Sequence, residues 1–142
     1  MPGAILSISA WYDMELKNGT IQSNATNDKL LSKHVLEWFR EAWLGGTDIP
    51  WNDPRVNLLY ADLSDLPPIH VYYGDYELFV GEINEFAKRA KDAGVDVSVH
   101  SVPEGQHNFI LGAGRVPEVD SAIQHMGEWL RSRLYPSRQQ AV

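Results

Sequence analysis

Two apolar segments with a helix-like segment between them limit the folds open to this chain more than any other feature. Residues 69–73 (IHVYY) and 95–102 (VDVSVHSV) have the apolar, β-branched character of strands. Residues 81–93 between them predict an amphipathic helix. Its apolar stripe consists of Ile83, Phe86, Ala87 and Ala90. A strand, a crossover helix and a second strand indicate a parallel βαβ unit, and hence an α/β fold.

An acidic residue follows the first of these strands, and a histidine follows the second. Glu77 lies in the segment GDYEL, and His107 lies in the turn-rich segment PEGQHNF. Because the carboxyl ends of parallel strands meet at one edge of a sheet, we expect the two side chains to lie close together. A carboxylate that orients a histidine is part of a Ser–acid–His triad, and in one class the chain order is nucleophile, acid, histidine. Glu77 and His107 are therefore the candidate catalytic residues.

Other interpretations of these residues stay open at this point. Asp75 is a rival for the role of the acid, and Glu77 alone is equally typical of a surface acid or a helix N-terminal charge. His107 alone is also compatible with a solvent-exposed loop histidine. Glu82 is interpreted as an electrostatic cap of the helix over residues 81–93.

The rest of the pattern extends the α/β fold at both ends. Residues 4–9 (AILSIS) predict a first strand that is buried on both faces. Residues 17–27 predict a loop, Asn27 or Asp28 an N-cap, and residues 30–44 a helix. A last helix is expected over residues 118–134. The apolar positions expected to face inward are Leu31, Val35, Trp38, Phe39 and Ala42 in the earlier helix, and Ile123, Met126, Trp129 and Leu130 in the last one.

A nucleophile for the predicted triad is missing from the sequence. No serine has the G-x-S-x-G context that a nucleophile elbow needs, and no HGG-type oxyanion motif is present. Three strands are also few for a parallel sheet, and a bare first strand over residues 4–9 would be an aggregation-prone edge. We therefore expect the chain to belong to a larger sheet, or to cover this edge as a homo-oligomer.

Composition excludes several classes of function. The net charge of −7 and pI near 5.1 argue against binding to nucleic acid or to an anionic membrane surface. The apolar runs are too short to span a bilayer, and the N-terminal residues do not resemble a signal peptide. With no cysteine, the chain has no disulfide, which is compatible with a cytoplasmic location.

Metal chemistry is not expected from the local histidine pattern. No two histidines are spaced i, i+4, and HEXXH is absent. The histidines other than His107 are interpreted as structural or exposed; these are His34, His70, His100 and His125.

The chain resembles the C-terminal part of the hormone-sensitive-lipase-like esterases of bacteria, which have an α/β-hydrolase fold. The resemblance covers about residues 2–134 and rests on four motifs. A strand ending in S-P-W-x-D-L is matched by residues 9–14 (SAWYDM), and a D-P-x-x-S-P-L-x-A-x-L segment by residues 53–63. The acid motif G-x-x-[DE]-x-L is matched by residues 74–79 (GDYELF), with phenylalanine replacing the leucine, and the histidine motif by residues 105–109 (GQHNF).

This resemblance implies a fold and a function. The three strands would be the last three of the hydrolase sheet, within one α/β-hydrolase domain over residues 1–142. Residues 14–51 would be part of the helical cap, and residues 135–142 a frayed tail. Glu77 would be the triad acid and His107 the triad histidine of a carboxylesterase that acts on a small ester without a cofactor. The alternatives are an inactive assembly module and one half of a split esterase.

Overall fold

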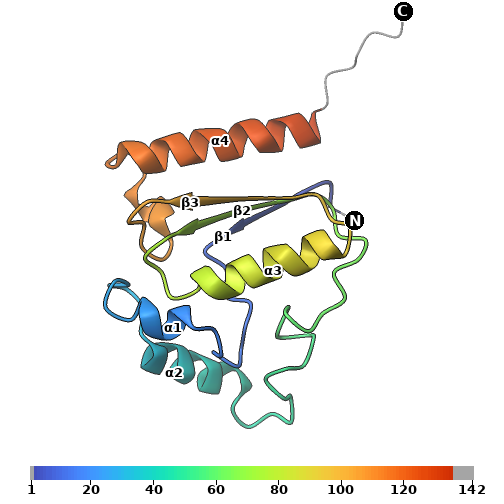
Figure 1. Ribbon diagram of the computed structural model, residues 1–142, viewed down its shortest axis with the longest axis vertical. Helices are drawn as coiled ribbons and strands as arrows, with labels where there is room; N and C mark the ends of the chain where they lie inside the picture. Colours follow the sequence, from blue (N-terminus) through green and yellow to red (C-terminus); the bar gives the residue numbers. More distant parts are fainter. Residues whose placement is uncertain (1, 136–142) are drawn as a thin grey trace, which may run out of the picture.

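The computed structural model describes residues 2–135, and it contains one parallel sheet with helices on both faces (Figure 1). The strands are β1 (Ile5–Ile8), β2 (Ile69–Gly74) and β3 (Val97–Val102), in the order β1-β2-β3. The helices are α1 (Thr20–Ser23), α2 (Lys33–Leu44), α3 (Val80–Asp92), the 3₁₀ turn η1 (Phe109–Gly112) and α4 (Pro117–Leu134). The predicted α/β fold with its parallel βαβ units is confirmed.

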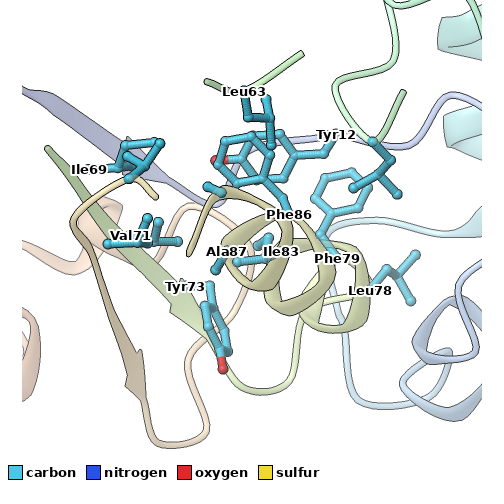
Figure 2. Packing of buried hydrophobic residues seen from close by; sticks show 14 of the residues in the cluster. Tyr12, Leu63, Ile69, Val71, Tyr73, Leu78, Phe79, Ile83, Phe86 and Ala87 are labelled. Atoms are coloured by element: carbon cyan, nitrogen blue, oxygen red, sulfur yellow. The ribbon is translucent and has the colours of Figure 1, made fainter. Parts of the chain in front are cut away.

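The period-two alternation of β2 divides the core between the two faces of the sheet. Ile69, Val71 and Tyr73 face α3, and there they join the larger apolar cluster (Figure 2). Tyr72 belongs instead to a smaller cluster beneath α4, on the opposite face (Figure 1). All six residues of β2 are buried because helices cover both faces of this central strand.

Helix α3 forms as its apolar stripe predicts. The four stripe residues are at most 4% exposed. The helix ends at Asp92, and Gly94 follows in the left-handed region with φ +88°, the conformation that terminates many helices. The stripe therefore fixes both the helix and the face that it presents to the sheet.

The carboxyl ends of β2 and β3 meet through two glycines. A Cβ atom on Gly74 would lie 2.2 Å from the carbonyl oxygen of Gly105, and one on Gly105 would lie 2.8 Å from the Cα of Gly74. The Tyr76 amide donates to the Gly105 carbonyl at 3.1 Å. The turn that carries Glu77 and the loop that carries His107 are thus packed backbone against backbone.

Several sequence-based expectations are wrong in detail. Residues 5–8 are half-buried rather than buried, because β1 is an edge strand with β2 as its single neighbour among residues 2–135. Helix α2 begins at Lys33 with Ser32 as N-cap, since the Asp28 carboxylate instead accepts amides of residues 30 and 31. The loop predicted over residues 17–27 contains the short helix α1.

The inward faces of two helices also differ from expectation. In α2 the buried residues are Leu36, Arg40 and Leu44, whereas Trp38 and Phe39 are exposed. In α4 Met126 is buried as expected, but Ile123 is 39% exposed. The apolar residues outnumber the positions that face the core, so periodicity did not select the correct face.

Two further findings concern the limits of the chain. Within residues 2–135, no helix combines the length and apolar character needed to cross a membrane. The predicted frayed tail over residues 135–142 lies outside the described residues, except for Tyr135 at the end of α4.

Gly74→Ala should destabilise the fold because its methyl group would overlap the Gly105 backbone, which cannot rotate away. We expect a loss of at least about 2–3 kcal/mol in the free energy of unfolding, measured by urea denaturation. The matched control is Gly127→Ala in α4, where a Cβ meets nothing within 4 Å. It should be neutral or stabilising by up to about 1 kcal/mol. Equal stability of the two variants would contradict the close backbone contact.

Candidate active site

The structure brings Glu77 and His107 into direct contact. His107 Nδ1 lies 3.1 Å from Glu77 Oε2, across the junction between the loops that follow β2 and β3. The Glu77 side chain is 0% exposed and that of His107 is 18% exposed. A buried carboxylate against a partly accessible imidazole is the arrangement in which an acid orients a general base.

The other oxygen of Glu77 is held by two donors. Its Oε1 accepts the Gly74 amide at 2.7 Å and the Ser9 hydroxyl at 3.0 Å. Burial raises the pKa of Glu77, while the hydrogen bonds from His107 and Gly74 act in the opposite direction. These donors replace the water that the carboxylate loses, and they fix the direction in which Oε2 points.

Ser9 also connects Glu77 to the histidine loop. Its hydroxyl accepts the Asn108 amide at 3.1 Å while it donates to Glu77. Both Ser9 and Asn108 have left-handed backbone conformations, with φ of 47° and 53°. Non-glycine residues adopt this region at a cost, and they often do so at functional sites. The end of β1 is therefore a third element that positions the pair.

The second nitrogen of His107, Nε2, is hydrogen-bonded to the side chain of Asn108. If Nδ1–H donates to Glu77, Nε2 carries the lone pair and accepts the Asn108 side-chain amide at 2.9 Å. The Phe79 ring meets the imidazole edge to face, with centroids 5.3 Å apart. These contacts leave His107 with one defined ring orientation.

Residues 18–29 support both loops, a role that the sequence analysis missed. The Asn24 amide donates to the carbonyls of Asp75 and Glu77 at 3.2 and 2.9 Å, and the Asp28 carboxylate accepts the Leu78 amide at 3.1 Å. Gln106, next to His107, accepts the amide of Lys29 and donates to the carbonyl of Asn27. The predicted polar loop over residues 17–27, together with Asp28 and Lys29, thus holds the acid turn and the histidine loop together.

A second buried carboxylate lies near the pair. Glu82 is 0% exposed, and its Oε1 accepts the amides of Tyr12 at 2.6 Å and Asp13 at 3.1 Å. Its Oε2 is buried without a partner among the described residues. Burial raises the pKa of Glu82 to about 8. Glu82 lies in the first turn of α3 as expected, but its role extends to the chain that follows β1.

The rival acid occupies a different position. Asp75 makes no side-chain hydrogen bond to His107 in the described residues, and its buried Oδ1 has no partner there. The geometry favours Glu77, and the catalytic roles of Glu77 and His107 stay predictions. The supporting roles of Ser9 and Glu82 could not be predicted from local motifs, because each acts through contacts with segments distant in sequence.

Comparison with known proteins identifies the family. The sequence model of a protein family that is described as "alpha/beta hydrolase fold" matches residues 1–111 of this chain. The chain belongs to this family. An esterase from Acinetobacter venetianus is 30% identical over 93% of this chain and 43% of the esterase. An acetyl-hydrolase from Streptomyces hygroscopicus is 27% identical over 93% of this chain and 44% of its own length.

A solved structure supports the same assignment. The crystal structure of an esterase from the bacterial hormone-sensitive lipase family matches 94% of this chain with a TM-score of 0.90 and 33% identity, over 44% of that esterase. This α/β-hydrolase chain therefore spans less than half the length of the relatives that it matches. The resemblance found in its motifs is confirmed.

Glu82→Gln should make the stability of this hydrolase chain less dependent on pH. Glutamate has a pKa near 4.5 when unfolded, and that of Glu82 is about 8 in the fold. Its protonation therefore stabilises the fold fully below about pH 4.5, and this contribution is lost as the pH rises through 8. Between pH 5 and 9, wild type should lose at least about 1 kcal/mol more than the variant in urea denaturation.

Glu85→Gln is the matched control for this experiment. Glu85 lies on the exposed face of the same helix, so its replacement should leave the wild-type pH dependence unchanged. If the Glu82 and Glu85 variants behave alike, the buried Glu82 carboxyl does not titrate as described.

Proposed function

We propose that this chain supplies the acid and the general base of a serine carboxylesterase. The observation that carries the proposal is the 3.1 Å contact between His107 and the buried Glu77 at the carboxyl edge of the sheet. The esterase and acetyl-hydrolase relatives support an ester as the substrate class. We further propose a cytoplasmic location, supported by the absence of cysteine from the sequence.

The proposed chemistry divides between the two side chains. His107 Nε2 takes the proton from a serine hydroxyl as the serine oxygen attacks the ester carbonyl. It then gives this proton to the departing alcohol, which leaves the acyl group on the serine. Water then attacks the acyl-enzyme as Nε2 takes its proton, and Nε2 returns this proton to the serine oxygen as the carboxylic acid leaves. Glu77 fixes the tautomer of His107 and stabilises its cationic form. The reaction needs no cofactor.

The serine must come from another segment in this proposal. Among residues 2–135, no serine hydroxyl forms a hydrogen bond with His107 Nε2, whose partner is the Asn108 amide. A parallel strand placed beside β1 would lie about 4.8 Å from it and would end next to Ser9. Ser9 is linked to both Glu77 and the histidine loop, so a nucleophile delivered there would be close to the pair. The Asn108 side chain would have to turn away.

The surface beside β1 supports this requirement for a further segment. A cavity of about 430 Å³ lies there, and it is largely apolar. Its lining includes Ile5, Ile8, Ala10, Tyr12, Leu58 and Leu63. The outer edge of β1 pairs with no strand among residues 2–135, and together with this edge the cavity has the character of a surface that another segment covers. We propose that the nucleophile-bearing segment covers it, and that a second copy does so when that segment is absent.

A chimera tests the catalytic roles directly. In it, this chain replaces the aligned segment of the Acinetobacter esterase, and we expect the rest of that esterase to supply the nucleophile. The chimera should hydrolyse p-nitrophenyl acetate or butyrate. His107→Ala should lower kcat/KM by roughly 10⁴-fold or more, and Glu77→Gln by roughly 10³–10⁴-fold, since a triad acts as a unit.

Two controls accompany the chimera. His34→Ala changes an exposed histidine of α2 and should leave kcat/KM within about twofold. Asp75→Asn changes the rival acid and should cost far less than Glu77→Gln. A severe loss in Asp75→Asn with a mild one in Glu77→Gln would show that the acid is misassigned. An active chimera that tolerates His107→Ala would refute the proposed base.

The isolated chain should self-associate through the apolar surface beside β1. Light scattering at micromolar concentration should give a mass above that of the 16.0 kDa monomer. Leu58→Lys places a charge in the apolar lining at a residue that is already 39% exposed, so it should shift the protein toward monomer without unfolding it. Leu111→Lys, at a residue 75% exposed outside this lining, is the control. A monomeric wild type with rapid amide exchange along β1 would contradict the proposal.

A further inference from the structure

We propose that His70, His100 and His125 form a binding site for a divalent transition-metal ion of the Zn²⁺ class between the sheet and α4. One ligand nitrogen from each of the three imidazoles lies within 4.8 Å of the others. The ring centroids are 4.8 Å apart for His70–His100 and His100–His125, and 5.3 Å apart for His70–His125. The site contains neither Glu77 nor His107.

Strand register explains how residues distant in sequence converge. In the parallel pairing, His70 lies opposite Ser98, and Tyr72 opposite His100. Alternation along each strand places these four side chains on the face that α4 covers. Helix α4 then contributes His125, whose ring meets those of both strand histidines (Figure 1 shows α4 over this face). A search for local i, i+4 spacing cannot detect such a cluster, because each histidine comes from a different element.

Hydrogen bonds at the Nδ1 atoms leave the Nε2 atoms of two rings available as ligands. His70 Nδ1 bonds to the Ser98 hydroxyl, and His125 Nδ1 lies 2.5 Å from the Tyr72 hydroxyl. His70 is 1% exposed, and its Nε2 has no partner among the described residues. A buried nitrogen without a partner is costly, and metal-binding histidines commonly use their other nitrogen in such a hydrogen bond. Ser98 and Tyr72 would be these supporting partners.

The surroundings of the two strand histidines, His70 and His100, favour the neutral imidazole, which is the form that binds metals. Burial lowers the pKa of His70 to about 4, and burial also lowers that of His100. Arg133 lies close enough to contribute to the low pKa of His70. Its guanidinium is paired with the Asp96 carboxylate at 2.6 Å, which offsets a charge that would repel a cation.

The site is accessible to an ion and can contract around it. His100 and His125 line a cavity of about 260 Å³, and Glu118 and Ser121 are also part of its lining. In a tetrahedral zinc site with bonds of about 2.0–2.1 Å, two ligand nitrogens lie roughly 3.3 Å apart. The nitrogens of the exposed His125 and the half-buried His100 must therefore move toward that of the buried His70 by up to about 1.5 Å. Three imidazoles leave the fourth position to water or to a group from the cavity.

Metal titration of the 142-residue chain tests the site. Co²⁺ should bind at one equivalent and develop the visible absorption of a low-coordinate site, and Zn²⁺ should then displace it. Zn²⁺ should also raise the Tm, because it links β2, β3 and α4 only in the folded state. Absence of Co²⁺ absorption together with an unchanged Tm would overturn the proposal.

Variants separate this site from adventitious binding. His100→Gln and His125→Gln, at residues that are not fully buried, should each weaken Zn²⁺ binding by at least about 10-fold, and Tyr72→Phe should weaken it by roughly 10–100-fold. His34→Gln, at an exposed position on α2, is the control and should bind as wild type does. Binding that survives both His100→Gln and His125→Gln, or that falls equally in His34→Gln, would place the metal elsewhere and refute the inference.

Discussion

The contact between Gly74 and Gly105 is the constraint on which the candidate site depends. These glycines allow the chain after β2 and the chain after β3 to approach backbone to backbone, at a separation that excludes any Cβ atom. The approach places Glu77 and His107 within hydrogen-bonding distance. The supporting bonds from residues 18–29 and from Ser9 then hold a geometry that the glycines make possible. Both glycines belong to the motifs that carry the acid and the histidine, so their role in those motifs is steric.

The two buried carboxylates, Glu77 and Glu82, differ in their hydrogen-bonding partners and therefore in the charge state that burial favours. Glu77 has the imidazole of His107 beside it, so an ionised carboxylate there gains a hydrogen-bonded partner that can carry positive charge. Glu82 has only backbone amides on one oxygen and no partner among residues 2–135 on the other, and burial raises its pKa to about 8. The charge of Glu77 contributes to that rise. A protonated Glu82 can therefore connect α3 to the chain after β1 without placing a second full charge near the pair.

Local patterns in the sequence were sufficient for the central βαβ unit. The stripe of α3, the alternation of β2 and β3, and the placement of Glu77 and His107 at strand ends all depend on periodicity and on parallel topology. Patterns failed where several segments compete for one role. The sequence predicted Asn27 or Asp28 as the N-cap of α2, yet the Asp28 carboxylate supports the Glu77 turn as well as its own turn, while Ser32 caps α2. The contributions of Ser9, Glu82 and the three clustered histidines arise from register and long-range packing, which spacing within one element cannot reveal.

The two faces of the sheet differ in what holds them together. The α3 face has the larger apolar cluster, in which the ring of Tyr12 stacks on that of Phe86 with the ring centroids 4.0 Å apart. The α4 face has a smaller apolar cluster, and beside it the sheet presents imidazole and phenol groups to the helix. Polar groups in such a position stabilise the packing only when their hydrogen-bonding capacity is satisfied, and the buried His70 Nε2 is not satisfied by the described residues. A bound metal ion would satisfy this nitrogen and would add a second connection between α4 and the sheet, beside the apolar contacts of Val119, Ala122 and Met126.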